Sequence, residues 1–208
     1  MVIPALLRHG SSVIRIGITG GIGMGKSSAS EFLARDGIPV ADSDGIAREL
    51  VAPGQAALGE IVAAFGGGML RADGTLDRSR LGELVFRDSG ARSCLESILH
   101  PRIRAQWQGR LAAWGASGAR AGAVVIPLLY ETSVEERFDT VVCVACSGAT
   151  QRERLHRRGW SDGEVDRRNA AQWAVGEKMR RARFVIWTEP PLVEVGEQWR
   201  LIRGTLGI

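Results

Sequence analysis

The sequence predicts an α/β fold in which a five-stranded parallel sheet is flanked by helices. Five short segments are continuously hydrophobic rather than alternating, which is typical of strands covered on both faces. Helical patterns lie between them, as β-α units require. A glycine-rich run follows the first of these segments directly. The predicted strands are Arg15–Thr19, Ile38–Ala41, Ala123–Leu128, Thr140–Cys146 and Phe184–Trp187.

The first two predicted helices follow from apolar residues spaced three and four apart. Ser27–Arg35 carries one such face and ends at Asp36-Gly37, where glycine suits a helix C-terminus. A second apolar stripe runs from Ile46 to Val51 and ends before Pro53. Each of these helices follows a predicted strand, as expected for a parallel sheet.

About eighty residues separate the second and third strands, far more than an ordinary crossover contains. Their patterns predict a helical insertion, which is a natural candidate for a substrate-binding subdomain. Pro101 interrupts the last pattern, so we expect His100 to leave helical geometry and a new helix to begin at Pro101. The predicted helices of the insertion are Gln55–Phe65, Asp77–Phe86 and Ala91–Trp114.

Composition indicates an ordinary globular protein of 208 residues, with 45% hydrophobic and 24% charged residues. No apolar run approaches the roughly 20 residues of a membrane-spanning helix. Three cysteines do not make a disulfide framework, so we expect a cytoplasmic protein. Cys143 and Cys146 form a C-x-x-C within a predicted strand, where residues three apart face opposite sides. We therefore expect two packed cysteines rather than a redox or zinc site.

Basic residues are unevenly distributed. The chain has a net charge of +4 and contains 25 arginines but only two lysines, Lys26 and Lys178. Residues 151–183 hold nine arginines and one lysine against five acidic residues, a local charge of +5. Such a segment can bind nucleic acid, close over phosphates or form a solvated helix face. Trp160 and Trp173 are its only aromatic residues, a thin supply for base stacking, so we expect no nucleic-acid partner.

The glycine-rich run Gly20–Ser27, "GGIGMGKS", matches the phosphate-loop pattern G-x-x-x-x-G-K-[ST] between a strand and a helix. Its glycines let backbone N–H groups converge on phosphate oxygens at a helix N-terminus. Lys26 supplies charge to the β- and γ-phosphates, and Ser27 can ligate Mg²⁺. We therefore expect the P-loop NTPase/kinase fold and a nucleotide site. Its predicted residues are Gly21, Ile22, Gly23, Met24, Gly25, Lys26, Ser27 and Ser28.

A phosphate loop alone is compatible with phosphoryl transfer, hydrolysis or switching. GTPases usually read guanine through Asn-Lys-x-Asp, whereas the single asparagine here, Asn169, is not followed by lysine. A motor or remodelling ATPase would normally be longer. The favoured interpretation is a small-molecule kinase; the alternatives are another nucleoside or nucleotide kinase, and a hydrolytic or non-catalytic nucleotide-binding protein.

Carboxylates that follow the second strand are candidates for the catalytic base. Asp42 and Asp44 come at the carboxyl edge of the sheet, where ligands of open α/β folds bind. A carboxylate there can accept the proton of an acceptor hydroxyl, or orient that hydroxyl and help to hold Mg²⁺. Arg48 lies four residues after Asp44 and suits an anionic substrate. In the structural alternative, Asp44 caps the next helix and Arg48 is its ion-pair partner.

These motifs together resemble the dephospho-CoA kinase family, from about Arg15 to Ile186. The resemblance rests on several separate motifs in the family's order. It implies transfer of the ATP γ-phosphate to the ribose 3′-hydroxyl of dephospho-CoA, with Mg²⁺, which would give CoA and ADP. The motifs are "GITGGIGMGKS", "DSDGIARELVAPG", "FGGGMLRADGTLDRSRLGELVF", "LESILHPRIR", "VIPLLYE" and "QRERLHRRGWS".

The resemblance also implies individual roles. Asp44 falls on the proposed catalytic aspartate and Lys26 on the phosphate-loop lysine, while Arg154 and Arg158 match arginines of a lid that contacts ATP. Without the Leu-His-Pro context, His100 would be a cap or a packed polar residue. Glu131 either bonds locally at a strand end or contacts substrate or metal-bound water. The implied acceptor-site residues are Asp44, Arg48, His100, Arg104 and Glu131.

Departures from the family pattern occur near its end. Arg183 and Thr188 stand where the family usually has Asp and Asn, and Ala145 replaces a common strand-end Asp. Because that Asn usually lies near adenine, we expect an active kinase with altered base selectivity.

The sequence and the resemblance together predict one P-loop kinase domain over 15–208, as a monomer or small homo-oligomer. Its core comprises 15–45, 120–147 and 183–208, with an acceptor-binding insertion at about 46–119 and a lid at about 148–182. Residues 1–14 form a flexible N-terminal extension rather than a signal peptide, because the only arginine of its first twelve residues follows the apolar patch.

Overall fold

The computed structural model describes residues 13–189 and 191–208. These residues form two compact units, one made of residues 13–41 together with 111–189 and 191–208, the other of residues 42–110. Of the expected N-terminal extension, residues 1–14, positions 1–12 lie outside the described residues. Ile14 already belongs to the first strand.

The predicted five-stranded parallel sheet is confirmed, with strand order β2-β3-β1-β4-β5. β1 pairs in parallel with both β3 and β4, so that Ile18 lies opposite Val125 on one side and Val142 on the other. The most central strand is therefore the one that leads into the glycine-rich run. The strands are β1 (Ile14–Thr19), β2 (Val40–Asp42), β3 (Ala121–Val125), β4 (Thr140–Ala145) and β5 (Phe184–Trp187).

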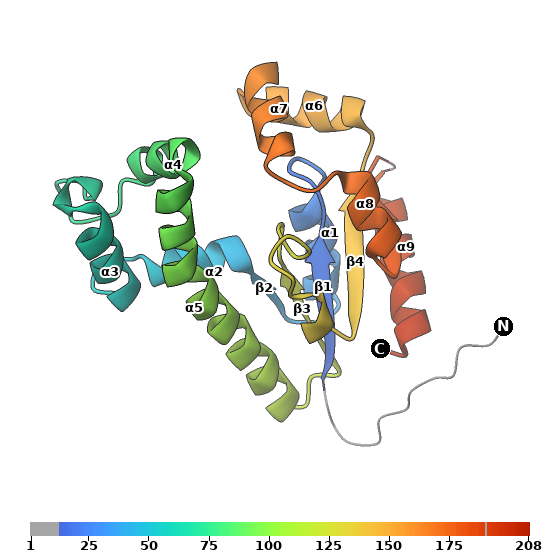
Figure 1. The fold of residues 1–208 in the computed structure, drawn as a ribbon. Helices are drawn as coiled ribbons and strands as arrows, with labels where there is room; N and C mark the ends of the chain where they lie inside the picture. Colours follow the sequence, from blue (N-terminus) through green and yellow to red (C-terminus); the bar gives the residue numbers. More distant parts are fainter. Residues whose placement is uncertain (1–12, 190) are drawn as a thin grey trace. The chain divides into compact units, whose positions relative to one another are not determined.

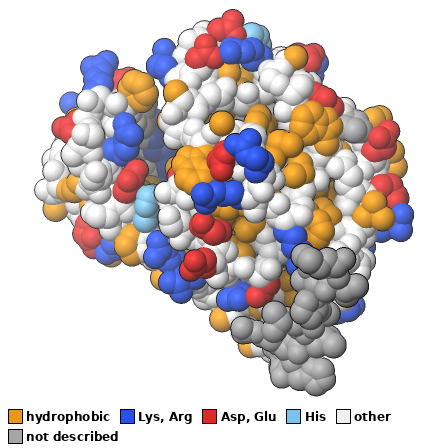
Figure 2. Space-filling model, turned by 45° about the vertical axis from the view of Figure 1, so that its right-hand side comes forward, with side chains coloured by type: hydrophobic (Ala, Val, Ile, Leu, Met, Phe, Trp, Pro, Cys, Tyr) orange, Lys and Arg blue, Asp and Glu red, His pale blue; other side chains and the backbone are white. Residues whose placement is uncertain are grey.

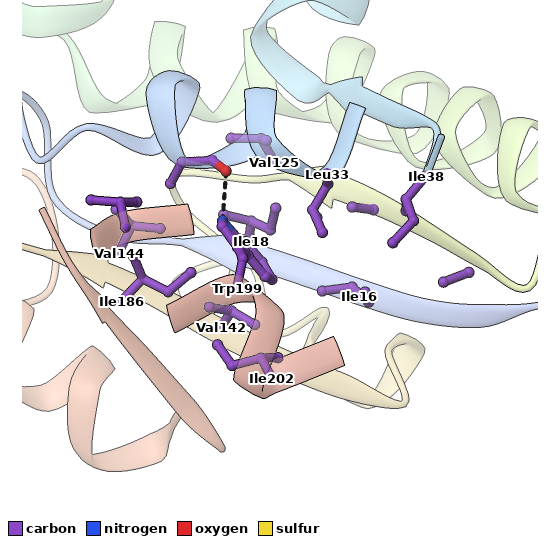
Figure 3. Packing of buried hydrophobic residues seen from close by; sticks show 14 residues of the cluster. Ile16, Ile18, Leu33, Ile38, Val125, Val142, Val144, Ile186, Trp199 and Ile202 are labelled. Carbon is purple, nitrogen blue, oxygen red and sulfur yellow. Dashed lines mark hydrogen bonds between the residues drawn. The ribbon is translucent and has the colours of Figure 1, made fainter. Parts of the chain in front are cut away.

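Helices α1 (Lys26–Arg35) and α9 (Leu192–Leu206) pack together against the sheet (Figure 1). The main apolar cluster lies beneath them, where Ile16 and Ile18 are fully buried (Figure 3). Trp199 of α9 is 1% exposed, and its Nε1 donates a 2.6 Å hydrogen bond to the Ala29 carbonyl of α1. A buried indole N–H without an acceptor would be costly, so this bond fixes how the two helices pack.

Three further helices of the first unit are α6 (Gly148–His156), α7 (Asp162–Ala170) and α8 (Val175–Arg181). The first two begin at serine caps. Ser147 accepts a hydrogen bond from the Thr150 N–H, and Ser161 accepts one from the Glu164 N–H. Serine is a preferred N-cap because its hydroxyl satisfies a backbone donor that the helix leaves unpaired.

The second unit is helical, as predicted for the insertion. A separate apolar cluster holds it together, with Ile61 fully buried and Leu58 and Leu81 nearly so. The Gly-rich turn after the second of its helices forms the short 3₁₀ segment η1 (Gly67–Met69). Its α-helices are α2 (Ser43–Leu50), α3 (Ala56–Phe65), α4 (Arg78–Arg87) and most of α5 (Ser89–Ala116).

The helix break predicted at Pro101 is wrong, because α5 continues through His100 and Pro101. Proline in a helix interior removes one backbone hydrogen bond and crowds the preceding turn. Buried side chains after the proline, such as Trp107 at 2% exposure, favour a continuous helix. Arg102 also donates a 2.7 Å hydrogen bond to the Ile98 carbonyl beside the interrupted turn. Packing therefore outweighs the local preference.

Cys143 and Cys146 are buried free thiols at β4 and just after it, as the predicted strand requires. Burial raises the pKa of the Cys143 thiol to about 11. Elsewhere, none of the helices in the described ranges has the length and apolar character needed to cross a membrane.

Candidate active site

The predicted phosphate loop connects β1 to α1, and its backbone requires glycine. Gly23 and Gly25 have φ angles of 72° and 86°, in the left-handed region that side chains disfavour. Gly20 has a φ of 145°, and a Cβ there would lie 2.1 Å from the Val144 carbonyl oxygen of the neighbouring strand. The glycine spacing thus produces a loop that turns tightly at the end of the central strand.

Lys26 directs its side chain back over this loop. Its Nζ donates hydrogen bonds to the carbonyls of Gly20, at 2.9 Å, and Gly21, at 2.7 Å. Ser27 and Ser28 are exposed in the first turn of α1. Among the described residues, no side chain caps this helix and its first turn contains no acidic residue. The helix N-terminus therefore offers backbone donors and a positive dipole to an anion.

Two residues that sequence reasoning did not assign hold this loop in place. Gln151 of α6 is 5% exposed, and its Nε2 donates a 2.7 Å hydrogen bond to the Ile22 carbonyl. The same amide bonds to Asn169 of α7. The Oγ1 atom of Thr188 lies 3.0 Å from the Met24 carbonyl oxygen and 3.3 Å from the Ala145 carbonyl oxygen. In the sequence, Thr188 stands out only as a departure and Gln151 only as the start of a motif, because each contact joins distant parts of the sequence.

Of the two predicted lid arginines, Arg154 lies beside the loop. It donates hydrogen bonds to both oxygens of Thr188, at 2.8 Å to Oγ1 and 2.5 Å to the carbonyl. Arg158 is exposed in the turn that follows α6. Thr188 and Arg183 are two of the positions at which this sequence departs from the family pattern. Thr188 lies between the phosphate loop and Arg154. The Arg183 guanidinium lies 5.3 Å from the centre of the Phe184 ring.

Glu131 bonds locally through one carboxylate oxygen. Its Oε1 lies 2.7 Å from Lys178 Nζ and accepts a 2.8 Å hydrogen bond from the Trp173 N–H. The other oxygen, Oε2, is buried and accepts no hydrogen bond from the residues that the structure describes. Of the two roles expected for Glu131, Oε1 thus makes local bonds.

In the second unit, Asp42 rather than Asp44 caps α2. The Asp44 N–H donates a 3.1 Å hydrogen bond to Asp42 Oδ1, and Arg48 Nη2 lies 3.5 Å from Asp42 Oδ2. The structural alternative with Asp44 as the cap is therefore wrong. Asp44 is exposed in the first turn of the helix, and Arg48 is exposed in its last turn. Because Asp42 makes the cap, the Asp44 carboxylate is not required for it.

His100 and Arg104 lie four residues apart on α5 and so share one face of that helix. Both are partly exposed. Arg104 Nε is buried without a hydrogen-bond partner in the described part of the chain, which is unusual for a guanidinium N–H. The face therefore presents an imidazole and a guanidinium that is not fully satisfied. Asp44, Arg48, His100 and Arg104 all belong to the second unit, and the phosphate loop, Arg154, Arg158 and Glu131 to the first.

The arginines of residues 151–183 are largely paired with acidic residues of the same segment. Arg152 contacts Asp162 and Asp166 at 2.8 and 2.6 Å, and Arg168 contacts Glu164 at 3.0 Å. On the face drawn in Figure 2, basic and acidic side chains likewise lie intermixed. These local ion pairs place acidic side chains beside many of the arginines, so the net charge of +5 is distributed over small groups of residues.

Comparison with known proteins gives one consistent family. The model of the family described as dephospho-CoA kinase matches residues 14–193. A dephospho-CoA kinase of Anaeromyxobacter dehalogenans is 47% identical over 172 residues, covering 82% of this chain and 82% of that protein. One of Bdellovibrio bacteriovorus is 43% identical over 171 residues, covering 82% and 85%. A solved structure from Thermus thermophilus has a TM-score of 0.78 at 31% identity and covers 94% of this chain and 97% of that one.

Proposed function

This chain belongs to the dephospho-CoA kinase family, an ATP-dependent kinase family, and we propose how its residues perform that reaction. In this reaction, the last step of coenzyme A biosynthesis, the γ-phosphate of ATP passes to the ribose 3′-hydroxyl of dephospho-CoA. The observation that carries the proposal is the phosphate loop at the end of β1, within a family match that spans both units. The reduced cysteines support a cytoplasmic location.

The donor half of the reaction is assigned to the phosphate loop. Backbone N–H groups from Gly21 to Ser28 bind the phosphates of ATP, and Lys26 exchanges its carbonyl contacts for β- and γ-phosphate oxygens. The exposed hydroxyl of Ser27, next to Lys26 in the first helical turn, suits a Mg²⁺ ligand. When bound, Mg²⁺ neutralises charge on the β- and γ-phosphates.

The acceptor half is assigned to the second unit. Asp44 accepts the proton of the attacking 3′-hydroxyl, and its carboxylate is exposed in the first turn of α2. Arg48, His100 and Arg104 bind the anionic groups of dephospho-CoA, since guanidinium groups pair well with phosphate oxygens. Glu131 belongs to the first unit and is assigned an indirect role, through the residues that it positions.

Arg154 and Arg158 are assigned to the closing lid over ATP. Charge develops on the transferred phosphoryl group, so arginines of a closing lid both stabilise it and exclude water. Local pairing of most other arginines in residues 151–183 supports this role over a nucleic-acid surface, which needs a continuous basic patch.

The direct test is to incubate the protein with Mg-ATP and dephospho-CoA and to follow CoA and ADP by chromatography. We expect one CoA for each ADP. An ADP rate that does not increase when dephospho-CoA is added would overturn the proposal in favour of a hydrolytic protein. Faster turnover with a nucleoside than with dephospho-CoA would favour a nucleoside kinase instead.

A further inference from the structure

The second of the two lysines has no role in the reaction as described above. Lys178 lies on α8, is 0% exposed and is among the largest fully buried side chains of the described residues. A buried ammonium group is costly unless hydrogen bonds and an opposite charge compensate it. Its contacts therefore indicate what the residue does.

Lys178 joins α8 to the segment that follows β3. Its Nζ lies 2.7 Å from Glu131 Oε1 and donates a 2.7 Å hydrogen bond to the Pro127 carbonyl. Glu131 Oε1 in turn accepts a hydrogen bond from the Trp173 N–H, just before α8. Three contacts therefore fasten the end of the lid segment to residues 127–131. We call Lys178, Glu131 and the Pro127 carbonyl the lid anchor.

The lid anchor also reaches the start of the phosphate loop. The Pro127 carbonyl that accepts from Lys178 also accepts a 3.2 Å hydrogen bond from Thr19 Oγ1. Thr19 is the last residue of β1 and directly precedes Gly20. One carbonyl oxygen therefore connects α8 to the residue on which the phosphate loop begins.

Other contacts hold the same two segments together without the buried charges. The rings of Tyr130 and Trp173 are stacked, with centroids 6.1 Å apart and planes 12° from parallel. The Arg181 guanidinium lies 4.7 Å from the Trp173 ring centre and 5.9 Å from that of Tyr130. Because these contacts remain when the charges are removed, the segment can stay folded in suitably matched variants.

We propose that Lys178 and Glu131 are positioning residues for phosphoryl transfer, which fix the base of the lid relative to the phosphate loop. This inference rests on the proposed kinase function. A buried ion pair is a poor source of stability compared with apolar packing, but it selects one arrangement because each charge must meet its partner. Lys178 has that effect here, since displacement of α8 would separate its buried ammonium group from the largely buried carboxylate of Glu131.

The test compares three variants, Lys178→Met, Glu131→Gln and the double variant. Each single variant leaves one buried charge, so we expect its melting temperature to fall by about 10 °C. The double variant removes both charges, and the amide oxygen introduced by Glu131→Gln still accepts from the Trp173 N–H. We expect its melting temperature to recover to within about 3 °C of the original, while kcat falls about tenfold or more because the lid is misplaced.

The matched control is Arg200→Met with Glu197→Gln, an exposed ion pair on α9 at 2.7 Å. We expect this control to keep kcat, KM and melting temperature, since exposed pairs contribute little. If the double variant at positions 178 and 131 retains the original kcat and KM, the pair is only structural and the proposal is overturned.

Hydrogen exchange gives a readout that does not depend on turnover. In the original protein, peptides covering 173–178 should exchange at least about tenfold more slowly than the turn at 157–159, because buried anchors protect them. In the double variant this protection should fall while that of β1 remains. Equal exchange of 173–178 and 157–159 in the original protein would overturn the lid anchor even if no variant folds. Absence of CoA formation by the original protein would instead overturn the kinase assignment.

Discussion

Arg154 donates to both oxygens of Thr188, and the Thr188 hydroxyl is also within hydrogen-bond distance of the Met24 carbonyl in the phosphate loop. A threonine hydroxyl has one proton to donate and two lone pairs to accept with. It can therefore accept from Arg154 while donating to the loop. Through Thr188, the phosphate loop therefore positions Arg154, which is a proposed ATP-binding residue.

Replacing Thr188 with valine should weaken ATP binding. Valine keeps the shape but removes the hydroxyl, so Arg154 retains only the carbonyl acceptor and the Met24 carbonyl loses a donor. We expect KM for ATP to rise about three- to tenfold, as for loss of one ordinary hydrogen bond, with kcat changed less. Thr188→Ser restores the hydroxyl and should restore KM. Equal KM values for the valine and serine variants would contradict this role.

Replacing Asp44 with asparagine should abolish most phosphoryl transfer while ATP still binds. Loss of a general base typically lowers kcat about 10²- to 10⁴-fold. Steady-state kinetics will measure this loss, and calorimetric titration with ATP will show whether the variant still binds ATP. Asp42→Asn makes the same chemical change two residues earlier and keeps a competent helix cap, so its loss in kcat should be much smaller. A larger loss in Asp42→Asn would transfer the catalytic role to Asp42.

Replacing Gly20 with alanine should displace the phosphate loop. The new Cβ would lie 2.1 Å from the Val144 carbonyl, at a φ of 145° that alanine disfavours. We expect unfolding free energy to fall by about 3 kcal/mol and ATP to lose its effect on melting temperature. Gly37→Ala is the control, because Gly37 also has a positive φ, 77°, but no atom near the added methyl. Its cost should be about 1 kcal/mol, with ATP binding retained.

Stability in acid should depend on Glu189. Hydrogen bonds from Ser147 and Thr150 lower the pKa of this carboxyl to about 2, from an ordinary value of 4.5. The folded protein therefore holds the proton less tightly than the unfolded chain, so the stability contributed by Glu189 is complete above pH 4.5 and is lost as pH falls toward 2. In Glu189→Gln, melting temperature should fall less steeply over this range. Parallel curves for the two proteins would contradict the assignment.

Local sequence features predicted the parts of the structure that depend on local chemistry. The five strands followed from continuous apolar segments, and the phosphate loop followed from glycine spacing around Lys26. Both patterns are complete within a few residues, and no distant partner is needed to interpret them. Helix caps are harder to predict, because Asp42 and Asp44 both follow the strand and only the backbone geometry selects Asp42.

Other features depended on contacts between distant residues. Gln151 bonds to Ile22 across 129 positions of the sequence, and Thr188 bonds to Met24 across 164. Such partners have no shared period or spacing, so sequence patterns do not reveal them. The helix through Pro101 was predicted wrongly for the same reason, since the burial that stabilises it is a tertiary effect. Lys178 was recognised only as a scarce residue, and its partners appear only in the fold.

The sheet order carries a consequence for how the protein loses activity on heating. Because β1 is bonded on both sides, by β3 and β4, its end cannot fray as an edge strand can. Nucleotide affinity should therefore persist until the whole sheet melts, rather than decline through partial opening. A ligand held at that strand also stabilises the folded state by mass action. The melting temperature of this enzyme should consequently rise with the concentration of ATP, because ATP binds at the end of the central strand.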